Sequence, residues 1–286
     1  MSNIGNATDV PHIQLEGTPT RRGARRVLVS TVVVGAIAVL WEGAKALFDL
    51  PIYKLPHIHQ IFAELVRESG DGQWMLTTLL ENAFVTAGEA AVGFVFGGLL
   101  GFLLAVGFSR STLMERGLLP YVIASQTVPI LAIAPMIVVW LGTTWVSKAV
   151  IATYLTFFPV TIHVLRGLRS VERDAVALLE SYAATPTQIF FKLRLPASLP
   201  YLFTALRISA TASVVGAVVG ELPVGSQFGM GVVLINAAQY YNWRPAALWA
   251  AILVSALMGI GFYALVAVLE RLIVTWKPQS ERGATP

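Results

Sequence analysis

The chain has 286 residues, of which 56% are hydrophobic and only 13% carry a charged side chain. Soluble domains carry about 25% charged residues, so this composition predicts a membrane protein, although the length alone would fit one or two soluble domains. The absence of cysteine excludes disulfides, thiolate catalysis and cysteine metal sites, and the net charge is only +4.

The chain begins with a polar segment, residues 1–26, which ends in an arginine-rich stretch. A basic region followed by an apolar run also occurs in signal peptides, but this run continues to Phe48 without a small-residue cleavage site. We therefore expect a disordered cytoplasmic tail over residues 1–26, followed by a membrane span that the mature protein retains.

Six stretches are long and apolar enough to cross a bilayer, which takes about 20 residues. They are residues 27–48, 77–108, 118–141, 146–166, 198–222 and 245–274. Backbone groups in lipid must bond within their own element, so these spans are expected to be helices. Between the first two, the segment from His57 to Arg67 has the pattern of an amphipathic helix on the membrane surface.

Basic residues are distributed unevenly between the loops. With the N-terminus inside, the segments on that side hold fourteen Lys and Arg residues, whereas the external loops hold four. Basic residues are enriched in cytoplasmic loops. The pattern therefore predicts that both termini are cytoplasmic, with residues 276–286 as a second tail and residues 167–197 exposed to the cytoplasm.

Small residues form a row on the second span, where Gly93, Gly97 and Gly101 recur at every fourth position. Such a row lets another helix approach closely. The partner is either a helix of the same chain or a second subunit. Gly216 and Gly220 form a shorter row of the same kind in the fifth span.

The third span is interrupted by Pro120, Pro129 and Pro135. Proline frees backbone carbonyls, which are tolerated in a membrane only beside protein or a watery cavity. Gln126 and Thr127 lie between these prolines. This segment is therefore either the wall of a translocation pathway or a kinked packing helix.

Ionisable residues inside spans are costly and face a bundle interior or a cavity. The candidates are Glu81, Glu89, Arg207 and Glu221. Arg207 is expected to pair with a carboxylate. Glu221, near the outer end of the fifth span, is either a solvated carboxylate at the interface or a residue that lines the pathway.

Charge is concentrated between the fourth and fifth spans, in a segment whose pattern predicts a helix, a turn and a second helix. Val176, Leu179 and Ala183 form an apolar face on the first helix. Thr185 and Pro186 fit the N-cap and the first position of the second. A polar helix pair with an apolar face fits a groove on a soluble partner.

The cytoplasmic run is expected to end at Leu195-Pro196. This segment resembles the cytoplasmic loop of the permease subunits of bacterial binding-protein-dependent ABC importers. In that family a Glu-Ala-Ala loop ends in Ile-x-Leu-Pro and contains the coupling helix that docks on the ATPase. Here Leu193-Arg194-Leu195-Pro196 matches the ending. The family's glycine falls on Ala183, and its signature acid falls on Ala177, so Glu180 comes three residues late.

The resemblance covers residues 37–275. The segment KLPHIHQIF and the runs QTVPILAIAPMIVVWLG and TFFPVTIHVLRGL are most similar to permeases for nitrate, sulfonates, taurine, riboflavin and pyrimidine precursors. The resemblance implies an all-α membrane domain over residues 27–275, with six transmembrane helices and a coupling-helix pair between the fourth and fifth. It also implies a place in the bacterial inner membrane.

The resemblance further implies a non-catalytic permease subunit. The partners would be a dimer of ABC ATPase subunits, a second permease copy, a periplasmic or lipid-anchored solute-binding protein and membrane lipid, but no nucleic acid. No GxxxxGK[ST] loop is present, so ATP and Mg would be bound by the partner, with no cofactor or metal in this chain. The residues expected to dock the ATPase are Glu180, Ala183, Ala184, Thr185, Pro186, Leu193, Leu195 and Pro196. The pathway candidates are Gln126, Thr127, Pro129 and Glu221.

Three other functions are compatible with a membrane protein of this size. An ion-gradient-driven carrier is the main alternative, but such carriers often contain internal repeats, and none is visible. A membrane-embedded enzyme would need paired catalytic residues at workable spacing, and a pure scaffold would not need an irregular third span. The substrate classes are a heterocyclic vitamin or pyrimidine precursor, or a small anion such as nitrate or sulfonate.

Overall fold

The computed structural model describes residues 19–68, 72–223 and 225–274, and every regular element in this part of the chain is helical. The elements are α1 (Pro19–Leu47), α2 (Ile58–Leu65), α3 (Met75–Arg110), α4 (Thr112–Ser125), α5 (Ile130–Leu141), α6 (Trp145–Arg169), α7 (Arg173–Ser181), α8 (Pro186–Ile189), the π-helix η1 (Phe190–Arg194), α9 (Leu195–Glu221), α10 (Met230–Gln239) and α11 (Pro245–Ile273). Most of the predicted N-terminal tail and all of residues 276–286 lie outside the described residues.

The chain divides between Ile58 and His59 into two compact units. The first contains α1, which begins at Pro19, so the backbone at the end of the predicted tail is helical. Near its C-terminus, α1 binds the proline-containing segment that follows it. The indole nitrogen of Trp41 donates to the carbonyl of Pro56 at 3.0 Å, and a carboxylate oxygen of Glu42 accepts from the amide of Ile58 at 2.8 Å. These bonds satisfy backbone groups that the proline-broken segment cannot pair by itself.

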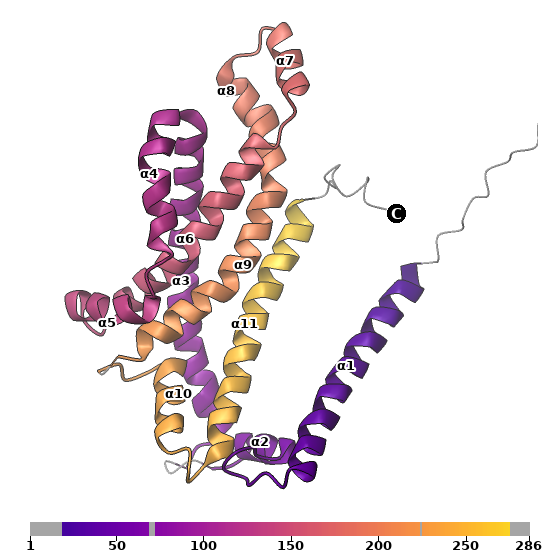
Figure 1. Cartoon of the computed structure of the whole chain (residues 1–286), viewed down its shortest axis with the longest axis vertical. Helices are drawn as coiled ribbons and strands as arrows, with labels where there is room; N and C mark the ends of the chain where they lie inside the picture. The colour runs from indigo at the N-terminus through magenta and orange to yellow at the C-terminus, as the bar shows by residue number, and fades with distance from the viewer. Residues whose placement is uncertain (1–18, 69–71, 224, 275–286) are drawn as a thin grey trace, which may run out of the picture. The chain divides into compact units, whose positions relative to one another are not determined.

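In the second unit, the long helices α3, α6, α9 and α11 run alongside one another (Figure 1). Helix α6 packs along both α3 and α9, so it is the central helix of the bundle. Half of its most apolar stretch is buried, the highest share among the long helices. Residues that lie far apart in the sequence are therefore held together through α6.

The small-residue rows explain this close packing. The three glycines of the row on the second predicted span, Gly93, Gly97 and Gly101, face α6. A Cβ atom on Gly97 would lie 2.6 Å from the Cβ of Thr156, which is closer than side chains can approach. Gly216 and Gly220 of α9 also contact α6 closely. Both rows are thus used for packing within one chain.

The third predicted span differs from a single kinked helix. Helices α4 and α5 are bent by 98° at the break between them, so five helices in the described residues are long and apolar enough to span, or six if this pair counts as one. Pro129 is the N-cap of α5, whereas Pro120 and Pro135 lie inside helices. The N–H of an N-cap residue makes no hydrogen bond within the helix, so a proline there loses none and the chain turns at Pro129 at little cost.

The helix that contains the fifth predicted span begins before that span. Helices α8, η1 and α9 form one helical run from Pro186 to Glu221, so the second helix of the charged segment continues through Leu195-Pro196. Pro196 lacks an N–H group and its ring clashes with the carbonyl four residues earlier in an α-helix. The π-helix lies immediately before it, where the amide of Leu195 donates to the carbonyl of Phe190. This wider turn lets the helix continue past the proline.

Two ion pairs connect α11 to the rest of the second unit. The predicted carboxylate partner of Arg207 is Glu270, and their closest atoms, Nε and Oε2, lie 2.6 Å apart. At the other end of α11, the side chain of Arg244 donates from Nε to Glu64 of α2 at 3.0 Å. Glu64 is buried, so this pair fixes α2 against the start of α11.

Candidate functional site

The first candidate site is the segment between α6 and α9, which projects from one end of the bundle (Figure 1). It consists of α7, a turn and α8, and most of its side chains are exposed. Asp174 lies in the first turn of α7, where a carboxylate is stabilised by the helix dipole. The helix–turn–helix prediction is correct for α7, whereas the second helix is the start of the long run that ends at Glu221.

The turn has two features that fix its shape. Ala183 has a φ of 58°, in the left-handed region that favours glycine. It is the position on which the resemblance places a glycine, and glycine adopts this conformation without strain. Thr185 caps α8 as predicted, with its hydroxyl accepting from the amide of Gln188 at 3.3 Å. The Gln188 side chain accepts in return from the amide of Thr185 at 2.8 Å, which completes a capping box.

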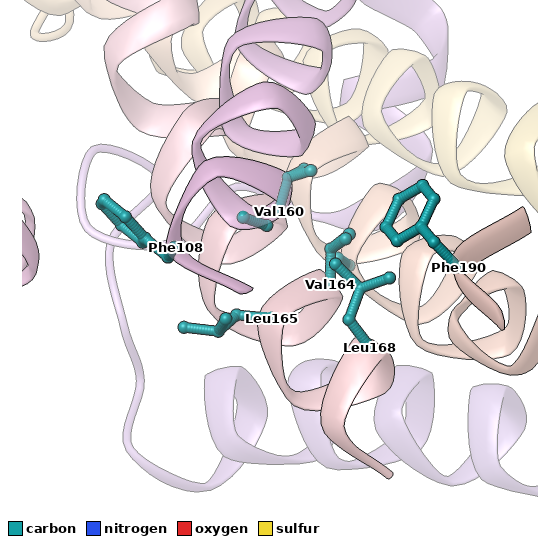
Figure 2. Packing of buried hydrophobic residues seen from close by; sticks show 8 residues of the cluster. Phe108, Val160, Val164, Leu165, Leu168 and Phe190 are labelled. Atoms are coloured by element: carbon teal, nitrogen blue, oxygen red, sulfur yellow. The ribbon is translucent and has the colours of Figure 1, made fainter. Parts of the chain in front are cut away.

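The segment is anchored to the bundle by Phe190. Its ring is buried with Val164 and Leu168 of α6, and the three side chains lie together in Figure 2. The guanidinium of Arg110, the last residue of α3, lies 4.5 Å from the centre of the same ring. This cation–π contact and the apolar packing join the ends of α3, α6 and η1. Phe190 therefore connects the turn to the ends of α3 and α6.

Glu180 lies on the side of α7 that faces the bundle. It lines two adjoining cavities, of 380 and 330 Å³, together with Ser109, Val176 and Arg194. Nearby, Arg169 at the end of α6 donates to Glu115 of α4 at 2.7 Å. The remaining predicted docking residues lie around the turn or behind it. Ala184 is half-buried in the turn, whereas Leu193, Leu195 and Pro196 are half-buried on the helical run.

Sequence reasoning missed three apolar side chains that the segment exposes. Leu178 is 57% exposed, Tyr182 77% and Phe191 57%. They do not belong to the apolar face predicted on α7. Leu178 precedes the half-buried Leu179, and Phe191 follows the buried Phe190. Large apolar side chains on a segment with so many charged residues are unusual unless a partner covers them. The sequence could have indicated them, because they do not follow the helical spacing of the residues that face the core.

The second candidate site is the break between α4 and α5. Gln126, Thr127 and Pro129 are all exposed there, as expected for residues that line a pathway or face another subunit. The hydroxyl of Tyr154 on α6 donates to the carbonyl of Ser125, just before the break. This bond satisfies one of the carbonyls at the end of α4 and fixes the position of the bend.

Glu221 is buried, which excludes one of its two alternatives, a solvated carboxylate at the interface. It is only 1% exposed, and its two oxygens accept from the hydroxyl of Thr86 and from the amide of Gly231, both at 2.6 Å. Beside it, Glu89 of α3 forms an ion pair with Lys148 of α6, with Oε1 and Nζ 3.1 Å apart. Lys148, one of the four basic residues counted above with the external loops, is 5% exposed and belongs to the bundle.

The two acidic groups and one lysine form a buried charged cluster that joins α3, α6 and α9. Glu221 interacts electrostatically with Glu89. Buried charges are retained only where they are paired and hydrogen bonded. Within the described residues, no group of three or more His, Cys, Asp or Glu side chains is arranged to hold a metal ion.

The chain matches a family described as "Binding-protein-dependent transport system inner membrane component" over residues 97–275. It is 31% identical over 257 residues to the formylaminopyrimidine transport permease protein ThiX of Halalkalibacterium halodurans, covering 88% of this chain and 97% of ThiX. It is 32% identical over 282 residues to the putative aliphatic sulfonates transport permease protein SsuC of Bacillus subtilis, covering 96% of this chain and 98% of SsuC.

The fold is similar to that of a solved chain of the MetNI methionine ABC transporter in an inward-facing conformation. The TM-score is 0.50 with 21% sequence identity, and the alignment covers 68% of this chain and 97% of the solved chain. At this identity the likeness concerns the fold alone. The fold over about two thirds of this chain is thus an arrangement known from a solved structure.

Proposed function

Because the chain belongs to the family of binding-protein-dependent transport system inner membrane components, we propose that it carries a solute inward after an external binding protein delivers it, driven by a separate ATPase docked on residues 172–193. Family membership makes the chain a non-catalytic permease subunit of an ABC importer and a multi-pass protein of the bacterial inner membrane. The docking site, the partners and the solute are the proposed parts.

The observation that carries the docking proposal is the exposure of Leu178, Tyr182 and Phe191 on a charged segment. A soluble partner that covers them would bury apolar surface and gain free energy, as an aromatic anchor does at the centre of an interface. Glu180, Ala183, Ala184, Thr185 and Pro186 surround these side chains along the chain. Leu193, Leu195 and Pro196 continue the run toward the membrane.

Closure of two ATPase subunits would move the α7–α8 turn, and the Phe190 contacts would carry the movement to α3 and α6. A docked segment that biases two packings of a helix bundle is a recurrent way of coupling a ligand to a conformational change. In this scheme both chain termini and the docking segment are cytoplasmic, and the missing Glu of the family signature is replaced by the apolar contacts around Tyr182.

A second copy of the chain would complete the pathway. Helix α5 exposes Val139 to 81% and Trp140 to 74%, and it follows the exposed break at Gln126 and Thr127. Two copies that meet at α5 would bury these side chains and place the polar residues of both breaks beside one pathway. Since the chain has no cysteine, Val139→Cys alone tests this arrangement, because a disulfide-linked dimer is expected after oxidation of membranes. A chain that stays monomeric after oxidation, while a cysteine elsewhere on α5 does cross-link, would contradict contact at Val139.

The substrate is proposed only as a class. ThiX and SsuC are similar to this chain to nearly the same degree, yet their names refer to a pyrimidine and to sulfonates. The candidates are therefore a heterocyclic vitamin or pyrimidine precursor, and a small anion such as nitrate or a sulfonate. Uptake of labelled formylaminopyrimidine, ethanesulfonate and nitrate by cells with and without the chain would separate these classes.

Affinity purification of the tagged chain in mild detergent tests the docking site directly. An ATPase subunit with a phosphate loop is expected to co-purify, and Tyr182→Glu is expected to release it, because the new charge would be buried without a partner. Tyr182→Phe keeps the apolar ring and serves as the matched control. Retention of the ATPase by Tyr182→Glu would place the docking site elsewhere, and uptake under an ion gradient without ATP would overturn the importer mechanism.

A further inference from the structure

The first turn of α10 is held by side chains from two other helices. Its amide groups lack partners within the helix, as at every helix N-terminus. The amide of Gly229 donates to Oδ1 of Asn82 at 2.7 Å, and the amide of Met230 donates to the hydroxyl of Thr86 at 2.8 Å. Together with the bond from Gly231 to Glu221, three successive amides are bound by α3 and α9. We call these six residues the α10 clamp.

The glycines of the α10 clamp are required for its geometry. Gly229 has a φ of 119°, and a Cβ atom there would collide with the carboxyl group of Glu221. A Cβ atom on Gly231 would lie 2.7 Å from the Cβ of Glu221. The carboxylate is therefore seated directly against the backbone, where its charge also suits the positive end of the helix dipole.

Next to these well-formed bonds lie polar atoms with no partner. The hydroxyl of Ser226, in the loop before α10, and the second carboxyl oxygen of Glu89 are buried and form no hydrogen bond within the described residues. The carboxyl groups of Glu89 and Glu221 also lie close together, and Lys148 forms an ion pair with Glu89 alone. Each unsatisfied group lowers the net stability of the closed arrangement. The loop 225–229 and α10 are held by hydrogen bonds, but they lie beside buried polar atoms that have no partner. A second arrangement of this segment can therefore have a similar free energy.

The segment also has the backbone features of a hinge. Gly225 and Gly229 bracket the loop, with φ values of 107° and 119°. Residues in this region of φ that are not restrained by regular helix absorb large backbone changes. The α10 clamp lies at the end of the bundle opposite to α7 and α8 (Figure 1). In the orientation that the basic residues predict, this end is external.

We propose that the α10 clamp is a latch, which holds the loop 225–229 and α10 closed against α3 in the state described here and releases them in the other state of the transport cycle. This goes beyond the proposed function and rests on it only for the source of energy. Asn82, Thr86 and Glu221 are then positioning residues, because they act on the external end through α10. Two alternative packings joined by a small set of contacts are sufficient for such a switch.

The absence of cysteine from the chain gives a direct test. In Ser226→Cys, a membrane-impermeant maleimide applied to intact cells reports whether the buried side chain becomes accessible from outside. Energised cells are expected to be labelled about tenfold faster than energy-depleted cells, since a closed state that dominates at rest leaves the open state as a minor population. Equal labelling with and without energy would overturn the latch.

The neighbouring Phe228→Cys is the matched control, because Phe228 is 64% exposed in the closed state. It is expected to be labelled at the same rate in both conditions. Labelling of Phe228→Cys only from the cytoplasmic side would place the loop inside and would also overturn the proposal. The ratio of the labelling rates of the two variants thus decides the result, whatever the solute is.

A disulfide between α3 and α10 tests whether the labelling depends on release of the α10 clamp. The 2.8 Å bond between Thr86 and the backbone of Met230 brings their Cα atoms within the ~7 Å that a disulfide spans. Oxidation of Thr86→Cys/Met230→Cys in the Ser226→Cys background is expected to abolish the energised labelling, and reduction to restore it. Labelling that persists after complete oxidation would show that the loop opens without release of α10, which contradicts the latch. A disulfide formed by Thr156→Cys and Ser209→Cys, across the α6–α9 contact, is the control. It is expected to leave the labelling unaffected.

The variant Tyr182→Glu separates this inference from the proposed function. If an ATPase docked at Tyr182 supplies the energy, the variant is expected to reduce the energised labelling of Ser226→Cys to the depleted level. Labelling that still depends on energy in this variant would contradict the docking site while supporting the latch. Labelling that is independent of energy in the parent chain, when the ATPase co-purifies normally, would contradict the latch alone.

Discussion

The two ends of the helix bundle differ in how far a single chain satisfies its own side chains. At the α10 end, Glu221 and Thr86 are buried and hydrogen bonded. At the α7–α8 end, Tyr182 and Phe191 are large apolar side chains that stay exposed. The bonds of the α10 clamp are made within one chain, whereas the exposed rings of the α7–α8 end gain free energy only when another surface covers them. Internal polar bonds thus hold one end, and partner contacts would stabilise the other.

Loss of the lysine at the α10 end is expected to have the largest effect. Lys148→Met leaves Glu89 buried without its ion-pair partner, and breaking a buried pair from one side costs about 3–5 kcal/mol of unfolding free energy. Thermal unfolding of the purified chain measures this loss. The double variant Lys148→Met/Glu89→Leu is expected to recover most of it, and Lys192→Met, at an exposed site, is the control. A single variant as stable as the parent would contradict the role of the pair.

Two neighbouring phenylalanines separate folding from docking at the other end. Phe190→Ala removes a ring from the core cluster in Figure 2 and is expected to cost about 3 kcal/mol or more of stability. Phe191→Ala removes an exposed ring, so stability is expected to change by less than about 0.5 kcal/mol, with weaker retention of the ATPase. Thermal unfolding and co-purification measure the two effects. A similar loss of stability in both variants would contradict the distinction between anchor and docking surface.

The capping box of α8 gives a smaller effect. Thr185→Ala removes the hydroxyl that accepts from the amide of Gln188, and loss of an N-cap costs about 1 kcal/mol. Hydrogen exchange of the amides at 187–189 is expected to accelerate several-fold in the free chain. Thr185→Ser keeps the hydroxyl and is the matched control. Unchanged exchange in Thr185→Ala would mean that contacts of Ile189 and Phe190, not the cap, hold this turn.

The smallest expected change is a gain. Ala183→Gly relieves a left-handed conformation, which costs a residue with a Cβ atom about 1 kcal/mol. The turn is therefore expected to be slightly more stable in the variant, by up to about 1 kcal/mol, offset in part by the greater backbone freedom of glycine in the unfolded chain. Ala184→Gly lacks the compensating relief and is expected to destabilise. Thermal unfolding measures both effects, and Ala183→Gly is expected to have a higher unfolding midpoint than Ala184→Gly. The reverse order would contradict strain at Ala183.

Much of the fold could be predicted because it depends on local properties. Apolar runs of sufficient length predicted the long helices, and Thr185-Pro186 predicted the start of α8. The spacing of Gly93, Gly97 and Gly101 predicted a close helix contact, although not that α6 is the partner. The sequence pattern did not show that the helix continues through Leu195-Pro196, which a π-helix before the proline makes possible.

By itself the sequence determined the membrane class, the spans, the cap at Thr185 and the position of the charged segment, because hydropathy and capping depend on residues a few positions apart. The tertiary structure decided that Glu221 is buried, that Lys148 is paired and that α4 and α5 bend by 98°. Glu221 meets Thr86 across 135 positions of the chain, and Asn82 meets Gly229 across 147. Such partners are chosen by the packing of helices around α6, and no local pattern specifies them.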